Sequence, residues 1–150
     1  MKNINYILVL ILIVSLISRL FSIYFYGDTH VDNEWGVILS NLENHGILGY
    51  RESEGVVFPT IYTPPLYPFF LYFIKIFFTD QLFFIKIVLH IQMILSILSI
   101  YVFYKILRNM FSEMISLIGT LIFSLYPLNV YSVSQISSIT LQVFFIVLFF

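Results

Sequence analysis

The chain has no cysteine and few charged residues. Without cysteine, disulfides and thiolate metal sites are excluded from all 150 residues. Charged residues make up 10% of the chain, whereas an ordinary soluble domain carries about 25%. The formal net charge of −1 argues against a nucleic-acid partner. Glycine-rich nucleotide loops, a P-loop, a zinc-protease motif and a serine elbow are also missing.

What is present is hydrophobic sequence. Hydrophobic residues form 60% of the chain and aromatic residues 19%, which predicts a polytopic membrane protein. The run Tyr6–Tyr26 holds 21 residues, enough to cross a hydrocarbon core of about 30 Å. No small-residue cleavage site follows it, so we expect a retained helix rather than a signal peptide. We expect an all-α, polytopic helical bundle with about four transmembrane helices, at residues 6–26, 82–107, 114–128 and 136–150.

The last of these runs stops in mid-hydrocarbon. Residues 136–150 supply about 15 residues of a span that needs about 20. A helix ending there would leave carbonyl groups unsatisfied in lipid. We therefore expect the chain to be part of a longer protein or the product of a truncated reading frame.

A polar segment between Gly27 and Thr63 interrupts the hydrophobic sequence. It carries one basic residue, Arg51, and six of the chain's eight acidic residues, namely Asp28, Asp32, Glu34, Glu43, Glu52 and Glu54. Charge is costly near hydrocarbon and tends to mark function in membrane proteins. We therefore place the candidate site in this segment.

Two short helices are expected within the first outward loop, residues 27–80. Apolar residues Trp35, Ile38, Leu39 and Leu42 recur at helical spacing and predict an amphipathic helix over 32–45. Gly46 suits the left-handed position that ends such a helix. Residues 51–63 have no period and are expected to be loop. The apolar run 65–78 is short for a crossing, so we expect a second membrane-surface helix there.

The basic residues set the expected orientation. With Lys2 in the cytoplasm and residues 65–78 lying on the surface, the helix 82–107 returns Lys105 and Arg108 to the cytoplasm. This arrangement follows the positive-inside rule. The loop 27–80 is then extracytoplasmic.

Two residues keep alternative interpretations. Arg19 lies about two turns from the outer end of the first span. It can extend its side chain to the interface, or it can pair with a loop acid or an anionic ligand. Asp32, like Thr29, can cap the N-terminus of the predicted helix 32–45, and spacing alone favours capping over catalysis.

The order of features resembles a known family. Asp32-Asn33-Glu34-Trp35 follows the first span, and Thr63-Pro64-Pro65-Leu66-Tyr67-Pro68 follows the predicted surface helix. A basic turn, 105–108, and the run Ser124-Leu125-Tyr126-Pro127 come next. This order resembles the N-terminal third of the GT-C membrane glycosyltransferases. The branch it resembles is that of the protein O-mannosyltransferases and lipid-A aminoarabinose transferases (glycosyltransferase family 39 type).

The resemblance implies transfer of a sugar from a polyprenyl-phosphate donor to a hydroxyl acceptor on the extracytoplasmic face. Asp32 stands where the family carries its catalytic base or acceptor-orienting acid, with Asp28 and Glu34 in reserve, and this places catalysis ahead of capping. The residues expected to bind substrate are Arg19, Trp35, Arg51 and Tyr67. A divalent cation is compatible with some branches.

One position departs from the family. Many relatives carry a glutamate where this chain has Ile139, within Ser138-Ile139-Thr140-Leu141, so a second acid from that segment is not expected. The implied location is the bacterial inner membrane, and the chain alone is expected to be inactive. The alternative class is a non-catalytic polytopic membrane protein, a transporter fragment or a scaffold, in which Asp32 is a helix cap.

Overall fold

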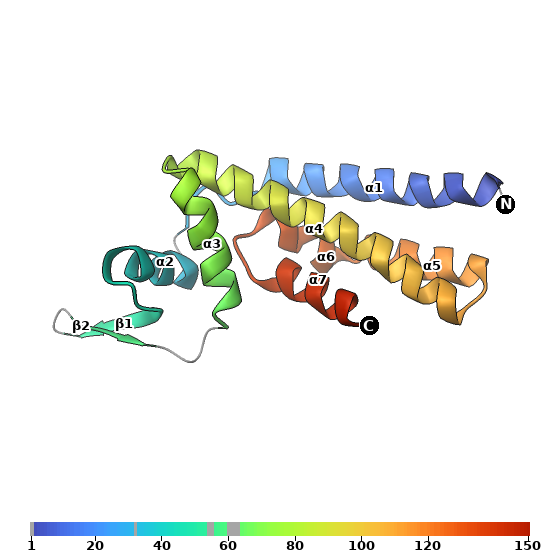
Figure 1. Ribbon diagram of the computed structural model, residues 1–150. Helices are drawn as coiled ribbons and strands as arrows, with labels where there is room; N and C mark the ends of the chain where they lie inside the picture. The colour runs from blue at the N-terminus through green and yellow to red at the C-terminus, as the bar shows by residue number, and fades with distance from the viewer. Residues whose placement is uncertain (1, 32, 54–55, 60–63) are drawn as a thin grey trace. The chain divides into compact units, whose positions relative to one another are not determined.

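The chain folds into two compact units. The structure, a computed structural model, describes residues 2–31, 33–53, 56–59 and 64–150. The first unit, here called the bundle unit, consists of Met1–Gly27 and Leu89–Phe150. The second, the loop unit, consists of Asp28–Val88. Figure 1 labels their helices and strands.

Two long helices have the length and composition of membrane spans. Helix α1 (Lys2–Tyr26) and helix α4 (Gln81–Met110) contain 25 and 30 residues, and both are apolar enough to cross a bilayer. The side chain of Asp80 caps the start of α4, because its Oδ1 accepts a hydrogen bond of 2.8 Å from the backbone N–H of Phe83. The two spans predicted over 6–26 and 82–107 are therefore present as helices, and the chain is a membrane protein by this criterion.

The rest of the bundle unit is discontinuous. Helix α5 (Glu113–Ser124) is followed by α6 (Pro127–Tyr131) and a 3-10 turn, η1 (Ser132–Ser134). The α5 axis and the segment Pro127–Ser134 are bent by 56°, so together they form at most one broken span. Helix α7 (Ile139–Phe149) has only 11 residues. Two of the four predicted spans are thus confirmed as long apolar helices, and one more is present only as this bent pair.

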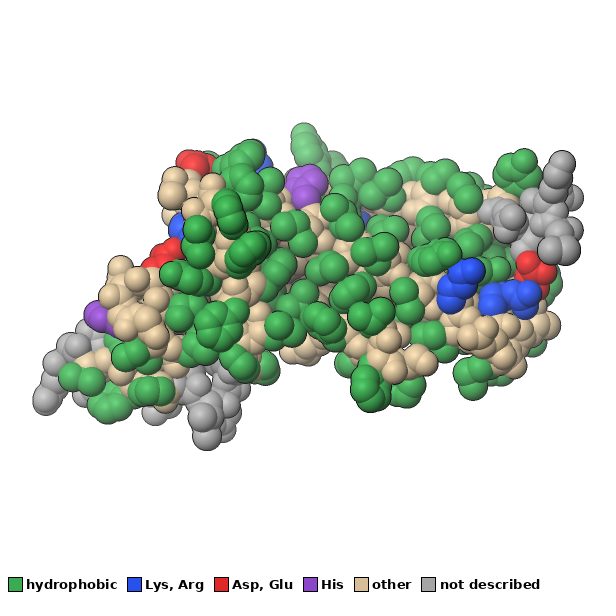
Figure 2. Space-filling model, viewed as in Figure 1, with side chains coloured by type: hydrophobic (Ala, Val, Ile, Leu, Met, Phe, Trp, Pro, Cys, Tyr) green, Lys and Arg blue, Asp and Glu red, His purple; other side chains and the backbone are tan. Residues whose placement is uncertain are grey.

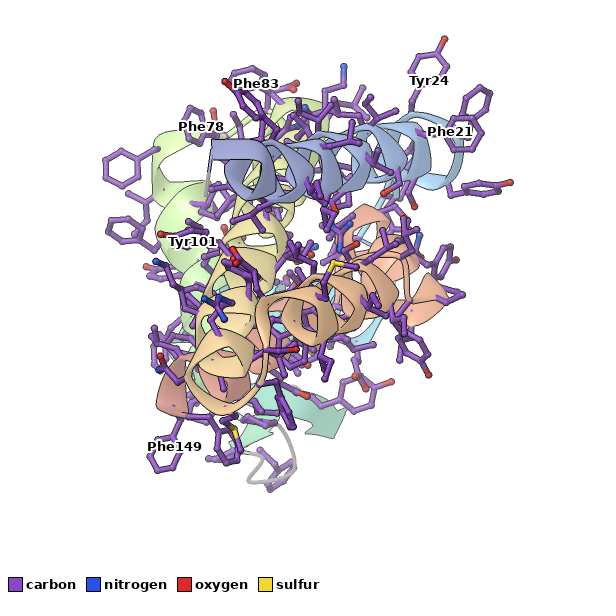
Figure 3. All side chains as sticks on the ribbon, turned by 90° about the vertical axis from the view of Figure 1, so that its right-hand side faces the viewer. Phe21, Tyr24, Phe78, Phe83, Tyr101 and Phe149 are labelled. Atoms are coloured by element: carbon purple, nitrogen blue, oxygen red, sulfur yellow. The ribbon has the colours of Figure 1, made fainter. Side chains whose placement is uncertain are left out.

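The outer surface of the bundle unit is apolar. On α1, Leu10, Ile17, Phe21 and Tyr24 are each more than half exposed. Figure 3 shows Phe21 and Tyr24 pointing away from the neighbouring helices, and Figure 2 shows hydrophobic side chains spread along the visible face. Exposed apolar area of this extent is unfavourable in water and suits hydrocarbon.

The interior of the bundle unit contains small hydroxyl side chains. Ser15, Ser116 and Thr120 are completely buried, and each donates to a carbonyl four residues earlier in its own helix, at 2.7–2.9 Å. A hydroxyl satisfied in this way needs no partner on another helix. Its small volume also lets helices approach closely, as is typical of membrane bundles.

The loop unit contains a β-hairpin where the sequence predicted loop. Strands β1 (Gly49–Ser53) and β2 (Val56–Pro59) pair antiparallel, with Arg51 opposite Phe58 and Ser53 opposite Val56. The prediction for 51–63 is therefore wrong over 51–53 and 56–59, while 60–63 lie outside the described residues. Gly49 permits the pairing, because a Cβ there would collide with the Val57 side chain and the Phe58 carbonyl.

The two short helices of the loop unit pack on each other. Helix α2 (Glu34–His45) and helix α3 (Leu66–Phe77) lie close to the predicted ranges. The apolar face of α2 is buried against β1 and α3. Its core positions are Trp35, Ile38, Leu39 and Leu42. The predicted membrane-surface helices are therefore present as helices, but the apolar face of α2 is covered by protein.

Both ends of α2 follow local rules. Gly46 has φ 68° and ψ 17°, and its N–H donates to the Leu42 carbonyl at 3.1 Å. The prediction that Gly46 ends the helix in the left-handed conformation is therefore confirmed. The N-cap is Asn33, whose Oδ1 accepts from the Trp35 N–H at 3.1 Å. Asn33 therefore takes the place that the sequence offered to Thr29, while Asp32 lies outside the described residues.

Candidate functional site

Polar side chains donate hydrogen bonds at the break between α5 and α6. Pro127 has no N–H and interrupts the helix, so carbonyl groups near the break lack their usual donors. Asn129 Nδ2 donates to the Phe123 carbonyl at 3.2 Å, and Arg19 Nη1 donates to the Ser124 carbonyl at 3.1 Å. Side chains thus replace the backbone donors, which irregular backbone requires wherever water is excluded.

Glutamines complete the same arrangement past η1. Gln92 Nε2, on α4, donates to the Gln135 carbonyl at 2.8 Å. Gln135 Nε2 donates to the Tyr26 carbonyl, also at 2.8 Å, where α1 ends. Gln92 is completely buried, and it bonds a neighbouring segment as a polar group inside a bundle is expected to do.

Arg19 is the central cation of the bundle unit. Its side chain is 0% exposed. Nε donates to Ser96 Oγ at 2.8 Å, and Nη1 donates to the Ser15 and Ser124 carbonyls at 3.1 Å each. Because the Ser124 carbonyl lies at the C-terminal end of α5, the guanidinium also meets the negative end of that helix dipole.

This geometry distinguishes between the alternative interpretations of Arg19, which were extension to the membrane interface and pairing with a loop acid or an anionic ligand. A side chain that reached the interface would be exposed, so the snorkelling interpretation is wrong. Pairing with a described loop acid is not seen either, since its partners are two carbonyls and a hydroxyl. The buried Nη2 atom has no hydrogen-bond partner among the described residues. Two N–H donors therefore point into the bundle without an acceptor there.

An open apolar groove lies beside the break. Its volume is about 370 Å³, and it is bounded by α1 and by the segment that follows α5. Its lining includes Ser18, Phe21, Ser22, Tyr26, Pro127 and Tyr131. Ser18 and Ser22 flank the turn of α1 that carries Arg19, so the groove runs next to the buried cation without reaching it.

The predicted acids fall in the loop unit. Asp32 lies outside the described residues. Asp28 is half-buried and has an interaction partner, whereas Glu34 is exposed as the first residue of α2. Asp28 lies near enough to Tyr67 for its charge to act on that phenol.

The predicted aromatic residues are brought together. The rings of Trp35 and Tyr67 meet edge to face with centroids 4.8 Å apart. Tyr67 is 1% exposed, and burial raises its pKa well above the ordinary value, with the Asp28 charge adding to the shift. Tyr67 therefore stays a neutral phenol. Both rings belong to the core of the loop unit, which places Asp28 beside that core.

For the remaining predicted residues, the structure shows no contact with Trp35, Tyr67 or Asp28 among the described side chains. The side chain of Arg51 lies outside the described residues, although its backbone belongs to β1. Among the described residues, no three histidine, aspartate or glutamate side chains cluster as metal ligands would. Ile139 begins α7, which confirms only that this position is apolar and helical.

Sequence reasoning missed several polar residues that the structure uses. Asn33 directly precedes the first periodic residues of α2, which is a recognisable capping signal. Asn129 and Gln135 follow the Tyr-Pro pair, where freed carbonyls require donors. Glu43 and Lys75 share a hollow, described below, that only the packing of α2 on α3 reveals.

Comparisons with known proteins add no family to this description: no family model, no curated protein and no solved structure matches the chain.

Proposed function

We propose that this chain is the N-terminal part of a GT-C type membrane glycosyltransferase. The observation that carries the proposal is the order of elements: a candidate span, a folded acidic unit and a second candidate span. A broken helix then follows at Ser124–Pro127. The motifs that resemble the family lie at these same elements.

The chemistry assigned to the loop unit is transfer of a sugar to a hydroxyl group. The oxygen of the acceptor hydroxyl attacks the anomeric carbon, and Asp32 accepts the proton of that hydroxyl. The polyprenyl phosphate leaves from the opposite face of the sugar. Asp28 and Glu34 remain the reserve acids. Asp28 is half-buried and near enough to Tyr67 for its charge to act on the phenol, which supports an acid at the edge of this core.

Positive charge is needed at the departing phosphate. Arg51 is the candidate within the loop unit. Arg19 is a weaker candidate than the sequence indicated, because three of its hydrogen bonds already go to the bundle unit. Its unpartnered Nη2 is the atom through which it would contribute. The proposed location is the bacterial inner membrane, with the N-terminus cytoplasmic and residues 27–80 extracytoplasmic.

A transfer assay on the complete gene product tests the proposal. With defined polyprenyl-phosphate sugars as donors, we expect Asp32→Asn to abolish transfer, because an amide cannot accept the hydroxyl proton. Glu113→Gln, at the start of α5, is the matched control and is expected to retain activity. Wild-type transfer rates in Asp32→Asn at equal protein level would remove the assignment and favour the non-catalytic alternative.

A further inference from the structure

A small polar hollow lies in the loop unit where α2, α3 and the start of α4 meet. Its volume is about 150 Å³. Gly36, Ser40 and Glu43 line it from one face of α2, at spacings of four and three residues. Lys75 of α3 and Gln81 and Phe84 of α4 complete the walls. The lining is mainly polar, unlike the groove beside the α5 break.

Two opposite charges face this hollow without pairing. Lys75 is half-buried, and its Nζ lies 5.0 Å from the centroid of the Phe84 ring. That ring is completely buried and holds the ammonium by a cation–π contact. Glu43 is exposed on the opposite wall. In the part of the chain that the structure describes, no salt bridge of 4.0 Å or less joins the two side chains.

The surrounding core fixes the two helices, α2 and α3, that carry these charges. Trp35 and Tyr67 interlock across α2 and α3, and Ile38, Leu71 and Ile74 are at most 5% exposed around them. Helices packed in this way move little, since a well-packed core resists deformation. Glu43 of α2 and Lys75 of α3 therefore stay on different walls of the hollow.

We propose that this hollow binds a small zwitterion carrying an ammonium group and a phosphate group, as in a phosphoethanolamine headgroup. Glu43 accepts hydrogen bonds from the ligand ammonium, and the Lys75 ammonium donates to the phosphate oxygens. The Gln81 amide and the Ser40 hydroxyl supply further donors. Ser40 Oγ already accepts a bond from Asn44 Nδ2 at 3.2 Å, which leaves its own proton to donate.

Size and charge favour a small zwitterion. The volume of about 150 Å³ lies below the size of about 300 Å³ at which drug-sized sites start. A ligand with only negative charge would be attracted by Lys75 and repelled by Glu43. A ligand with only positive charge would be attracted by Glu43 and repelled by Lys75. Only a ligand with both charges gains from both walls. The inference does not depend on sugar transfer.

The test is calorimetric titration of the whole chain, in neutral detergent micelles, with O-phosphoethanolamine and with inorganic phosphate. We expect saturable binding of one phosphoethanolamine, weakened about tenfold or more by Glu43→Gln and by Lys75→Met, since a charge-assisted hydrogen bond is lost in each. Inorganic phosphate is expected to bind more weakly and to lose affinity only in Lys75→Met.

Matched controls are available in the bundle unit. Lys105 Nζ lies 5.5 Å from the Tyr101 ring, the same kind of contact that Lys75 makes with Phe84. Lys105→Met and Glu113→Gln remove equal charges elsewhere and should leave the affinity unchanged.

Two results would overturn the inference. One is no saturable phosphoethanolamine binding by the wild-type chain. The other is equal affinity for phosphate and phosphoethanolamine with no effect of Glu43→Gln, which would make the hollow a simple anion site. The wild-type titrations with the two ligands stand even if a variant fails to fold. Nanodiscs of phosphatidylethanolamine that compete with the soluble probe would identify a lipid headgroup as the source, and nanodiscs that do not compete would identify a free zwitterion.

Discussion

At the scale of single residues, the buried Arg19 is held by hydrogen-bond partners that lie far away along the chain. Arg19 stands out within an apolar run, so its cost in hydrocarbon was predictable. Its acceptors were not, because Ser96 and the Ser124 carbonyl are 77 and 105 residues away along the chain. Such pairs arise only when helices pack. Tyr67 is a second example: the family resemblance indicated it as a substrate-binding residue, and the structure places it in the core of the loop unit.

Arg19→Met is expected to lower the stability of the bundle unit. The substitution leaves the Ser124 carbonyl buried without a donor, which costs about 1–3 kcal/mol. The free energy of unfolding in a detergent-to-denaturant titration measures the change. Arg108→Met, at an exposed position near the end of α4, is the control and should have little effect. Equal stability of Arg19→Met and wild type would show that the buried guanidinium does not support the break.

Tyr67 predicts how stability depends on pH. The folded loop unit keeps this phenol neutral because its pKa is raised, while the unfolded chain ionises it near pH 10. The raised pKa means that this contribution to stability is complete below about pH 10 and falls as the pH rises further. The denaturation midpoint should therefore decline less steeply above about pH 10 in Tyr67→Phe than in wild type. Identical declines in the two proteins would contradict this, and Tyr50→Phe, at a half-exposed position, is the control.

At the scale of elements, periodicity identified the helices and failed for the strands. The helical spacing in α2 and the turn at Gly46 are local signals that the chain carries within a few residues. The hairpin depends on contacts that sequence spacing does not reveal. Asn41 Nδ2 donates to the Gly49 carbonyl at 2.8 Å, and this bond holds β1 against α2. Short strands of mixed polarity offer no period to detect.

Gly49→Ala is expected to destabilise the hairpin. The added Cβ would overlap the Val57 side chain and lie 2.6 Å from the Phe58 carbonyl oxygen, so β2 must shift and the α2 contact loosens. Limited proteolysis in detergent should cut the loop unit faster in Gly49→Ala than in wild type. The control Tyr50→Ala alters an exposed neighbour in the same strand. If both variants are as resistant as the wild type, the tight approach of the two strands is not present in solution.

At the scale of the whole molecule, composition predicted a membrane protein but overestimated its regular spans. Hydropathy counts apolar residues and does not register where a helix must bend. Pro127 interrupts the predicted span 114–128, so that it becomes a bent pair in which Arg19 and Asn129 donate to the carbonyl groups at the break. Helix α7 has only 11 residues. Helix α3 has 12 residues, about 18 Å long, which is less than a hydrocarbon core of about 30 Å. This length supports a loop unit that stays on one side of the membrane.

The sidedness of the loop unit is therefore the claim on which the proposed function depends most. Because the chain has no cysteine, single-cysteine variants can be labelled in intact cells with a membrane-impermeant maleimide. We expect Arg51→Cys, in β1, to be labelled from outside. Glu113→Cys, at the start of α5, is expected to react only after the membrane is permeabilised. Labelling of both positions from the same side, or of Arg51→Cys only after permeabilisation, would contradict an extracytoplasmic acidic unit and the glycosyl transfer proposed for it.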